Sequence, residues 1–142
     1  MLSSEVITDT DYEALAEFRY RIRRFLHFSE QAARTAGVEP QQHQLMLALR
    51  GMPGAQAGIG TLAERLQIQH HSTVELLDRL EDRGLVTRSR APADRRQVIV
   101  RLTPRGEAEL EKLSRCHLDE LRQNGPVLVD ALQLLIRSIH GN

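Results

Sequence analysis

The chain has 142 residues, of which 41% are hydrophobic and 4% aromatic, and its 19 basic residues balance its 19 acidic residues. These values predict one globular domain with an aliphatic core, and they exclude a disordered chain. No apolar run is long enough to cross a bilayer, and the N-terminus lacks the pattern of a secretory signal. The single cysteine, Cys116, cannot form an intrachain disulfide. We therefore expect a cytoplasmic protein that does not enter a membrane.

The first third of the chain predicts two helices. Thr10 followed by Glu13 has the spacing of a capping box, and Gly37 suits the end of the helix that follows. Pro40 is expected to open the second helix. Apolar residues recur every three or four positions in both segments, which is typical of amphipathic helices. The expected inward residues are Leu15, Phe18, Ile22, Phe25, Leu26, Ser29 and Ala33 in the first helix, and Leu45, Met46 and Leu49 in the second.

The middle of the chain predicts two short helices separated by a tight turn. Residues 51–60 include four glycines and are expected to form a loop. Residues 61–68 predict a short helix, and a break over residues 67–70 leads to a further helix that Gly84 ends. The expected inward residues of this further helix are Thr73, Leu76, Leu77 and Leu80.

Residues 85–103 predict a β-hairpin with arginines at its tip. A first strand begins at residue 85, Pro92 lies in the turn, and Arg95 and Arg96 stand just before the returning strand. Apolar residues alternate along that strand, as period-two packing requires. Thr103 then has the position of an N-cap, with Pro104 at the first helical position. A hairpin tipped with arginines beside helices is suited to contact the edge of a DNA groove.

The C-terminal region predicts more helix than a small DNA-binding core needs. Gly125 and Pro126 are expected to break it into two helices. Because terminal apolar helices fray unless they are docked, we expect the two ends of the chain to form a two-fold dimer. The alternative is that they pack back on their own core. The apolar stripes are Leu110, Leu113, His117 or Cys116, and Leu121, followed by Leu128, Leu132, Leu135, Ile136 and Ile139.

Basic charge is concentrated in one segment. Residues 79–105 hold eight Arg against three acidic residues, an excess of five, although the whole chain is neutral. Lys112 is the only Lys in the chain. Arginine suits bidentate contacts to phosphates and base edges. The alternative is a solvated surface in a protein whose arginine content reflects a high-GC genome.

The motifs resemble those of the MarR family of bacterial transcription regulators. They are LAERL at residues 62–66, LLDRLEDRGLVTR at residues 76–88, the DRR…LT-x-x-G element at residues 94–106, and Gln42 at the second helix. The resemblance implies a mainly α fold with a small β-hairpin wing. One domain would hold a winged helix-turn-helix lobe (38–104) and dimerisation helices (10–37 and 105–142). It also implies recognition helices in successive major grooves of double-stranded DNA, wing tips in minor grooves, and repressors released by a phenolic or aromatic ligand or by cysteine oxidation.

The recognition helix is the further helix that Gly84 ends. The residues that contact DNA bases are expected at its start, because only this end of the helix reaches base edges. Val74 would contact a thymine methyl group, and Glu75 would accept from a cytosine amine. The family often has Thr and a basic residue at these two positions, so the target sequence is open. Arg79, one turn farther along, is expected to contact phosphate or to pair with Glu75. If the helix instead began later, Ser72 and Glu75 would form a capping box, and Glu75 would be structural. The predicted reading residues are His70, His71, Ser72, Val74, Glu75 and Arg79.

In the wing, Arg95 is the expected minor-groove residue, because a narrow A·T-rich groove concentrates negative potential. Asp94 is expected to hold the turn or to orient Arg96 by an ion pair rather than to touch anionic DNA. The effector pocket implied by the resemblance would use side chains of the first two helices, although the same residues equally suit a solid core. The candidate lining residues are Phe25, His27, Phe28, Met46 and Leu49.

Other chemistry has weaker support. His70 and His71 point about 100° apart on a helix and lack further ligands at zinc spacing, so we expect no metal and no cofactor. No catalytic motif is present, and we expect no enzyme. The leading hypothesis is a homodimeric repressor that binds a pseudo-palindromic operator and is released by a small molecule. The alternatives are a winged-helix protein-interaction module, which the neutral charge and Glu75 favour, and a thiol-based sensor through Cys116.

Overall fold

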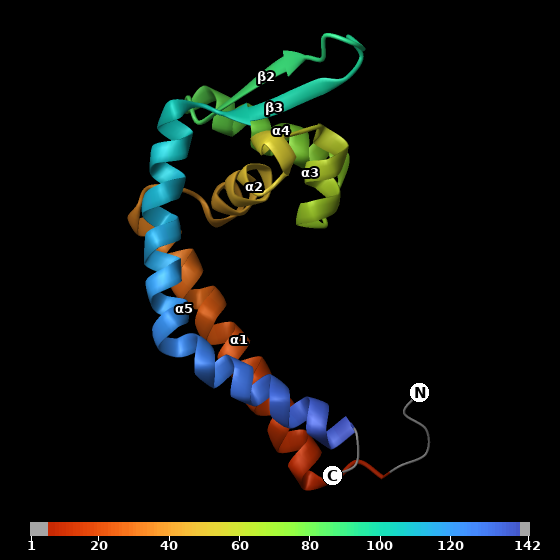
Figure 1. Cartoon of the computed structure of the whole chain (residues 1–142), viewed down its shortest axis with the longest axis vertical. Helices are drawn as coiled ribbons and strands as arrows, with labels where there is room; N and C mark the ends of the chain where they lie inside the picture. The colour runs from red at the N-terminus through yellow and green to blue at the C-terminus, as the bar shows by residue number, and fades with distance from the viewer. Residues whose placement is uncertain (1–5, 140–142) are drawn as a thin grey trace. The chain divides into compact units, whose positions relative to one another are not determined.

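The computed structural model describes residues 6–139, with side chains described through residue 137. Its elements in chain order are α1 (Asp9–Thr35), α2 (Pro40–Arg50), a 3-10 turn (Pro53–Ala55), β1 (Gln56–Ala57), α3 (Ile59–Leu66), α4 (His70–Asp82), β2 (Val86–Arg90), β3 (Val98–Leu102) and α5 (Pro104–Ile139) (Figure 1). Contacts divide the chain into a helical unit, residues 6–31 and 115–139, and a winged unit, Ala32–Ser114. The predicted mainly α fold with a small β-hairpin wing is confirmed.

The winged unit is built around one aliphatic core. Helix α2 contributes Leu45, Met46 and Leu49, all fully buried, and α4 contributes Leu77 and Leu80 at the spacing of one helix face. Further core residues are Val38, Ala57, Leu62, Leu76, Leu85, Val86, Val100, Leu110 and Leu113. These side chains join the three central helices, the wing and the start of α5, and so fix the start of α4 relative to the hairpin.

The wing is part of a three-stranded antiparallel sheet in the order β1-β3-β2. The hairpin register pairs Arg88 with Val100, while β1 pairs Ala57 with Val100 on the other edge of β3. The prediction of an uninterrupted loop over residues 51–60 is therefore wrong, because this segment contains the 3-10 turn and β1. A strand of two residues is too short to produce alternation, and it exists because β3 offers an open edge.

Helix α1 begins earlier than the sequence pattern indicated. The N–H of Thr8 donates to Oδ2 of Asp11 at 2.9 Å, and the N–H of Asp11 donates to Oγ1 of Thr8 at 3.2 Å. This reciprocal pair is the capping box, so the prediction of Thr10 with Glu13 is wrong. Both pairs have the required spacing, and the sequence alone does not choose between them.

The predicted glycine at the end of α1 is confirmed. Gly37 has φ +80°, and its N–H donates to the carbonyl of Arg34 at 2.9 Å. The next N–H, of Val38, reaches back to the carbonyl of Ala33 at 2.9 Å. These two bonds satisfy carbonyls that the helix end would otherwise leave open.

The start of α5 is locked against the wing. Thr103 caps the helix as predicted, since its Oγ1 accepts from the N–H of Gly106 at 3.0 Å and donates to the carbonyl of Gly84 at 2.6 Å. A Cβ on Gly106 would lie 2.1 Å from the carbonyl oxygen of Leu85. Only glycine allows this close approach of helix and strand.

The predicted break at Gly125 and Pro126 is wrong, because α5 runs without interruption from Pro104 to Ile139. Proline removes one N–H from the helical ladder, the one that would reach the carbonyl of Arg122. The turns on both sides retain their bonds, so the helix continues.

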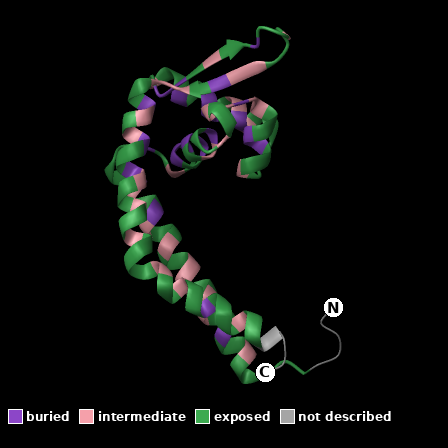
Figure 2. Cartoon of the chain, viewed as in Figure 1, coloured by how far each residue is buried: buried purple, intermediate pink, exposed green. Residues whose placement is uncertain are grey.

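The helical unit has little buried surface. Among its described residues, only Ala14, Ser29 and Ala131 are buried (Figure 2). Of the two candidates for its inner stripe, His117 is the half-buried one and Cys116 is exposed. The Nε2 atom of His117 lies 2.8 Å from Oγ of Ser29. No helix within residues 6–139 is long and apolar enough to span a membrane.

Candidate nucleic-acid interface

The turn before α4 sets where that helix begins. Gln67 adopts a left-handed backbone with φ +56°, and the N–H of Ile68 returns to the carbonyl of Ala63 at 3.1 Å. The side-chain Nε2 of Gln67 donates to the carbonyl of Glu64 at 2.8 Å. This bond offsets part of the strain of a non-glycine residue in this conformation. Helix α3 therefore ends abruptly, and only three residues separate it from α4.

The first turn of α4 is open. The helix begins at His70, and its N-cap, Gln69, makes no side-chain capping bond. The alternative in which Ser72 and Glu75 form a capping box is therefore wrong, because Ser72 already lies inside the first turn. The N–H groups of the first helical residues have no partner within the helix, and such groups attract anions.

The predicted reading residues fall on one accessible surface. His70, His71, Glu75 and Arg79 are exposed, whereas Ser72 and Val74 are half-buried. No hydrogen bond or ion pair joins Glu75 to Arg79 in the described chain, so the expected pairing of these two side chains is not found. Thr73 faces inward, fully buried, and its hydroxyl donates to the carbonyl of Gln69 at 3.0 Å.

The wing tip presents two guanidinium groups to solvent. The N–H of Gln97 donates to the carbonyl of Asp94 at 3.0 Å, which closes the turn. Oδ1 of Asp94 accepts from the backbone N–H of Arg96 at 3.0 Å and lies 3.7 Å from its Nε. The side chain of Arg96 is 96% exposed, and Arg95 is exposed as well. Asp94 thus holds the turn and pairs with Arg96.

Arg88 forms ion pairs that link β2 to α4, so it is not a free cation at the surface. Its Nη2 lies 2.7 Å from Oδ1 of Asp78 and 2.9 Å from Oε1 of Glu81. The hydrogen bond from Arg88 lowers the pKa of Glu81. The two ion pairs tie β2 to the outer face of α4, so the wing and the recognition helix are held together. The excess of arginine counted from the sequence is smaller at the surface for this reason.

A groove of about 510 Å³ lies between the starts of α3 and α4 and the tip end of β3 in the wing. It is lined by residues 58–61, by His70 and by residues 96–99, which include Thr61 and Gln97. Sequence reasoning missed these last two residues. Helix α3 was expected to start only at residue 61, and the groove arises from tertiary packing that no local pattern encodes.

The candidate effector residues fall in different surroundings. Met46 and Leu49 are fully buried in the core of the winged unit, which agrees with the packing alternative. In the helical unit, the rings of Phe25 and Phe28 each form a T-shaped pair with the ring of His117, while His27 is exposed. The part of the chain that the structure describes has no group of three His, Cys, Asp or Glu side chains able to hold a metal ion.

Comparison with known proteins agrees with this geometry. Residues 36–97, which run from the end of α1 to the wing tip, match the model of the MarR family. The winged lobe is that of the MarR family. Residues 36–97 thus form the winged helix-turn-helix lobe of a MarR family transcription regulator, and the similarity to Sco3205 shows the same fold. The matched region holds α4 and the wing tip and leaves out the whole of α1 and α5.

Three similar proteins illustrate how closely known sequences and solved structures match this chain. A protein named as a regulator of the hcr operon in Thauera aromatica is 26% identical over 113 residues, which are 80% of this chain and 67% of that protein. Sco3205 of Streptomyces coelicolor, solved in complex with DNA, has a TM-score of 0.74 and 19% identity over 97% of this chain and 90% of its own. BpsR of Bordetella bronchiseptica, whose DNA binding is regulated by 6-hydroxynicotinic acid, has a TM-score of 0.64 and 24% identity over 87% and 90%.

Gln42, the glutamine that contributed to the resemblance, has a structural role in the winged unit. Gln42 is buried, and its Oε1 accepts from the backbone N–H of Glu39 at 3.1 Å and from Nη1 of Arg83 at 2.9 Å. It therefore caps the start of α2 and holds the end of α4. The recognition helix is anchored at its far end by this contact and along its outer face by Arg88.

Proposed function

We propose that this MarR family regulator is a homodimeric repressor that binds a pseudo-palindromic operator in double-stranded DNA and is released by a small aromatic or phenolic effector. A regulator of this kind acts in the cytoplasm, where the bacterial chromosome lies. One observation carries the proposal. The uncapped, exposed start of α4 and the arginine-tipped wing border the same groove within one unit. This pairing suits one element for base edges and another for the neighbouring backbone.

Helix α4 would supply the sequence reading. Its first turn enters the major groove, where His71 and Ser72 donate to phosphates or base acceptors. Val74 contacts a thymine methyl group, and Glu75 accepts from a cytosine amine. Arg79, exposed one turn farther along, contacts phosphate. Because Glu75 repels phosphates, the helix adds little to nonspecific affinity, and the wing carries more of it.

The wing would supply a positioning contact. Arg95 enters the minor groove, and Arg96, paired with Asp94, contacts the backbone beside it. Arg88 keeps the wing at a fixed distance from α4 through its two ion pairs. The two contacts therefore act together on one half-site.

The helical unit would supply the dimer. Large apolar side chains are exposed along α1 and α5 in a single chain, among them Leu26, Leu118 and Leu132. A two-fold partner that covers them brings two winged units to half-sites about 34–36 Å apart on one face of the duplex. An effector that changes this separation by a few ångströms would break simultaneous docking and release the DNA.

Selection of bound duplexes from a random DNA pool tests the proposal most broadly. The full chain should enrich an inverted repeat whose half-sites are centred about one helical turn apart. Enrichment of a single half-site would contradict the dimer. Absence of any enrichment, with no salt-dependent retention of the pool, would favour the alternative of a protein-interaction module.

A further inference from the structure

Two arginines of β2 lie on the same face of the wing. Side chains alternate along a strand, so Arg88 and Arg90 project from the face that carries Val100, which is fully buried, and Val98. Arg88 pairs with two carboxylates of α4. Arg90 stands two residues nearer the wing tip, opposite Val98, and is exposed. The two arginines therefore have different partners although they share one face.

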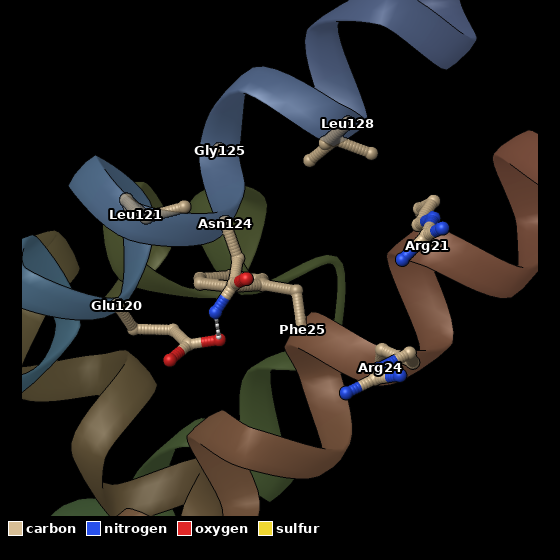
Figure 3. Close-up of a pocket in the computed structure, with 8 residues that line it drawn as sticks. All are labelled: Arg21, Arg24, Phe25, Glu120, Leu121, Asn124, Gly125 and Leu128. Atoms are coloured by element: carbon tan, nitrogen blue, oxygen red, sulfur yellow. Dashed lines mark hydrogen bonds between the residues drawn. The ribbon is translucent and has the colours of Figure 1, made fainter.

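Arg90 donates a hydrogen bond to the main chain of the wing tip. Its Nη1 lies 3.2 Å from the carbonyl oxygen of Arg95. Arg24 of α1, by contrast, donates to a side chain, the hydroxyl of Tyr20, at 3.2 Å, and it lines a hollow between α1 and α5 (Figure 3). Because the bond of Arg90 ends on a peptide group, it constrains the backbone of the tip.

The wing tip has few other constraints at this point. It is the connection over residues 91–97, between the end of β2 and the start of β3. The N–H of Gln97 donates to the carbonyl of Asp94 at 3.0 Å, which closes the turn around Arg95. Among the residues that the structure describes, only Arg90 donates a hydrogen bond to the carbonyl of Arg95. Loss of the Arg90 side chain would leave this peptide group to solvent.

Order in the tip matters for affinity. A side chain that enters a DNA groove is fixed there, and each residue that becomes ordered only on binding lowers the affinity by the entropy it loses. A backbone that is already held in one conformation avoids this cost. A charged donor forms a stronger bond to a carbonyl than a neutral donor does, so arginine suits this task.

We propose that Arg90 is a positioning residue of the DNA contact, which acts by holding the backbone of Arg95 in one conformation before DNA binds. Arg88 fixes the wing to the recognition helix, and Arg90 fixes the tip to the wing. Together they connect α4 to the tip through β2. The effect on DNA binding rests on the proposed function, whereas the ordering of the tip in the free protein does not.

Backbone NMR relaxation of the free full chain tests the ordering. In the parent chain, the order parameter of the Arg95 amide should be about 0.85, as in a rigid backbone, and in Arg90→Ala it should fall below about 0.6. Arg101→Ala is the matched control, because Arg101 lies on the other face of the hairpin and donates to Gln56. It should leave the Arg95 amide rigid. An Arg95 amide that stays rigid in Arg90→Ala overturns the proposal.

A double-mutant cycle tests the consequence for DNA. Fluorescence titrations at several salt concentrations use a mixed-sequence duplex of about 30 base pairs, which spans two half-sites one helical turn apart. Arg90→Ala should weaken binding by roughly threefold to tenfold, as expected for the loss of one hydrogen bond. In an Arg95→Ala background it should change affinity by less than about twofold, because the contact that it positions is already gone. Urea unfolding of each variant should give the midpoint of the parent chain.

The salt dependence separates positioning from direct contact. The double variant should lose about one unit of slope relative to the parent chain, as Arg95→Ala alone does. Additive losses of affinity, with about two units of slope lost, would show that Arg90 contacts the duplex itself, and the proposal would be wrong. It is also wrong if Arg90→Ala binds as the parent chain does.

The two measurements distinguish this inference from the proposed function. A parent chain without salt-dependent binding to the duplex sinks the proposed function, and the order parameter of Arg95 still decides whether Arg90 holds the tip. A parent chain that binds the duplex, with an Arg95 amide that stays rigid without Arg90, sinks this inference alone.

Discussion

The two units of this chain differ in how many of their large apolar side chains are buried within a single chain. In the winged unit, residues such as Leu45 and Leu77 are fully buried, and Leu47 is the only exposed large hydrophobic side chain among the residues described there. In the helical unit, large apolar residues such as Leu118 and Leu132 are about half exposed, and every buried residue among those described is small. Figure 2 shows the same contrast. One unit completes its core within a single chain, and the other does not.

Because of this difference, we expect the winged unit to determine the stability of the folded chain and the helical unit to determine its assembly with a second copy. Each large aliphatic side chain that becomes buried contributes about 1.5–3 kcal/mol. The winged unit gains that free energy when the chain folds. The helical unit gains it only when something covers α1 and α5, and a second copy presents the same surface. Substitutions in the two units should therefore change different measured quantities.

The largest expected effect compares two glycines on α5, one in each unit. Gly106→Ala places a Cβ 2.1 Å from the backbone oxygen of Leu85 and should lower the free energy of unfolding by about 3 kcal/mol. Gly125→Ala meets only Cβ of Leu121, at an ordinary contact distance of 3.9 Å, and should raise it by about 0.5–1 kcal/mol. Urea unfolding at fixed protein concentration measures both. Equal effects would remove the contrast in packing between the units.

The next effect separates assembly from folding. Leu132→Glu places a charge on the exposed apolar surface of α5 and should raise the dimer dissociation constant by tenfold or more, because two-fold symmetry introduces the charge twice. Leu47→Glu, at a similarly exposed leucine of the winged unit, should leave it unchanged. Sedimentation velocity over a concentration series measures the constant. Weaker assembly with Leu47→Glu alone would move the interface to the winged unit.

A smaller effect concerns DNA. Arg95→Ala should weaken binding to every sequence and reduce the slope of log affinity against log salt by about one, because one cationic side chain that displaces counterions from the duplex is lost. Arg23→Ala, in the helical unit, is the matched control and should leave the slope unchanged. Fluorescence titrations at several salt concentrations measure both variants. If the slope of Arg95→Ala matches that of the parent chain, the wing tip does not contact the duplex.

The smallest effect is a pH dependence within the winged unit. Arg88 lowers the pKa of Glu81 from its ordinary value of 4.5, so their pairing stabilises the fold above that pH and is lost as pH falls through the lowered pKa. Because Glu81 is largely exposed, we expect less than about 1 kcal/mol. Glu81→Gln should be slightly less stable than the parent chain at pH 7, and the two stabilities should converge as pH falls through the lowered pKa of Glu81. Asp82→Asn should show no such convergence in urea unfolding.

Sequence reasoning succeeded where a residue type has one local use. Gly37 and Thr103 end and begin helices as predicted, because a left-handed backbone and an N-cap each favour few residues. It failed where two local choices fit equally, as with Thr8 and Thr10. It also failed at Pro126, where a single proline does not end a long helix, and at β1, whose pairing depends on a distant strand edge.

Sequence reasoning likewise predicted one part of the candidate site and missed another. The wing tip was predictable, because its turn, strand and helix cap follow one another in the sequence. The groove with Thr61 and Gln97 was not, since three separate elements build it. Arg88 was counted as one more surface charge, although Asp78 and Glu81 neutralise it. Only tertiary structure brings such partners together from seven and ten residues away.

The central claim is that the incomplete helical unit pairs two chains so that two winged units bind one duplex. Sedimentation equilibrium of the full chain with a duplex carrying the selected inverted repeat tests it most directly. The account predicts two chains per duplex, and a dimer of the free protein at micromolar concentration. A monomeric free protein that binds the repeat as one chain per duplex would contradict it.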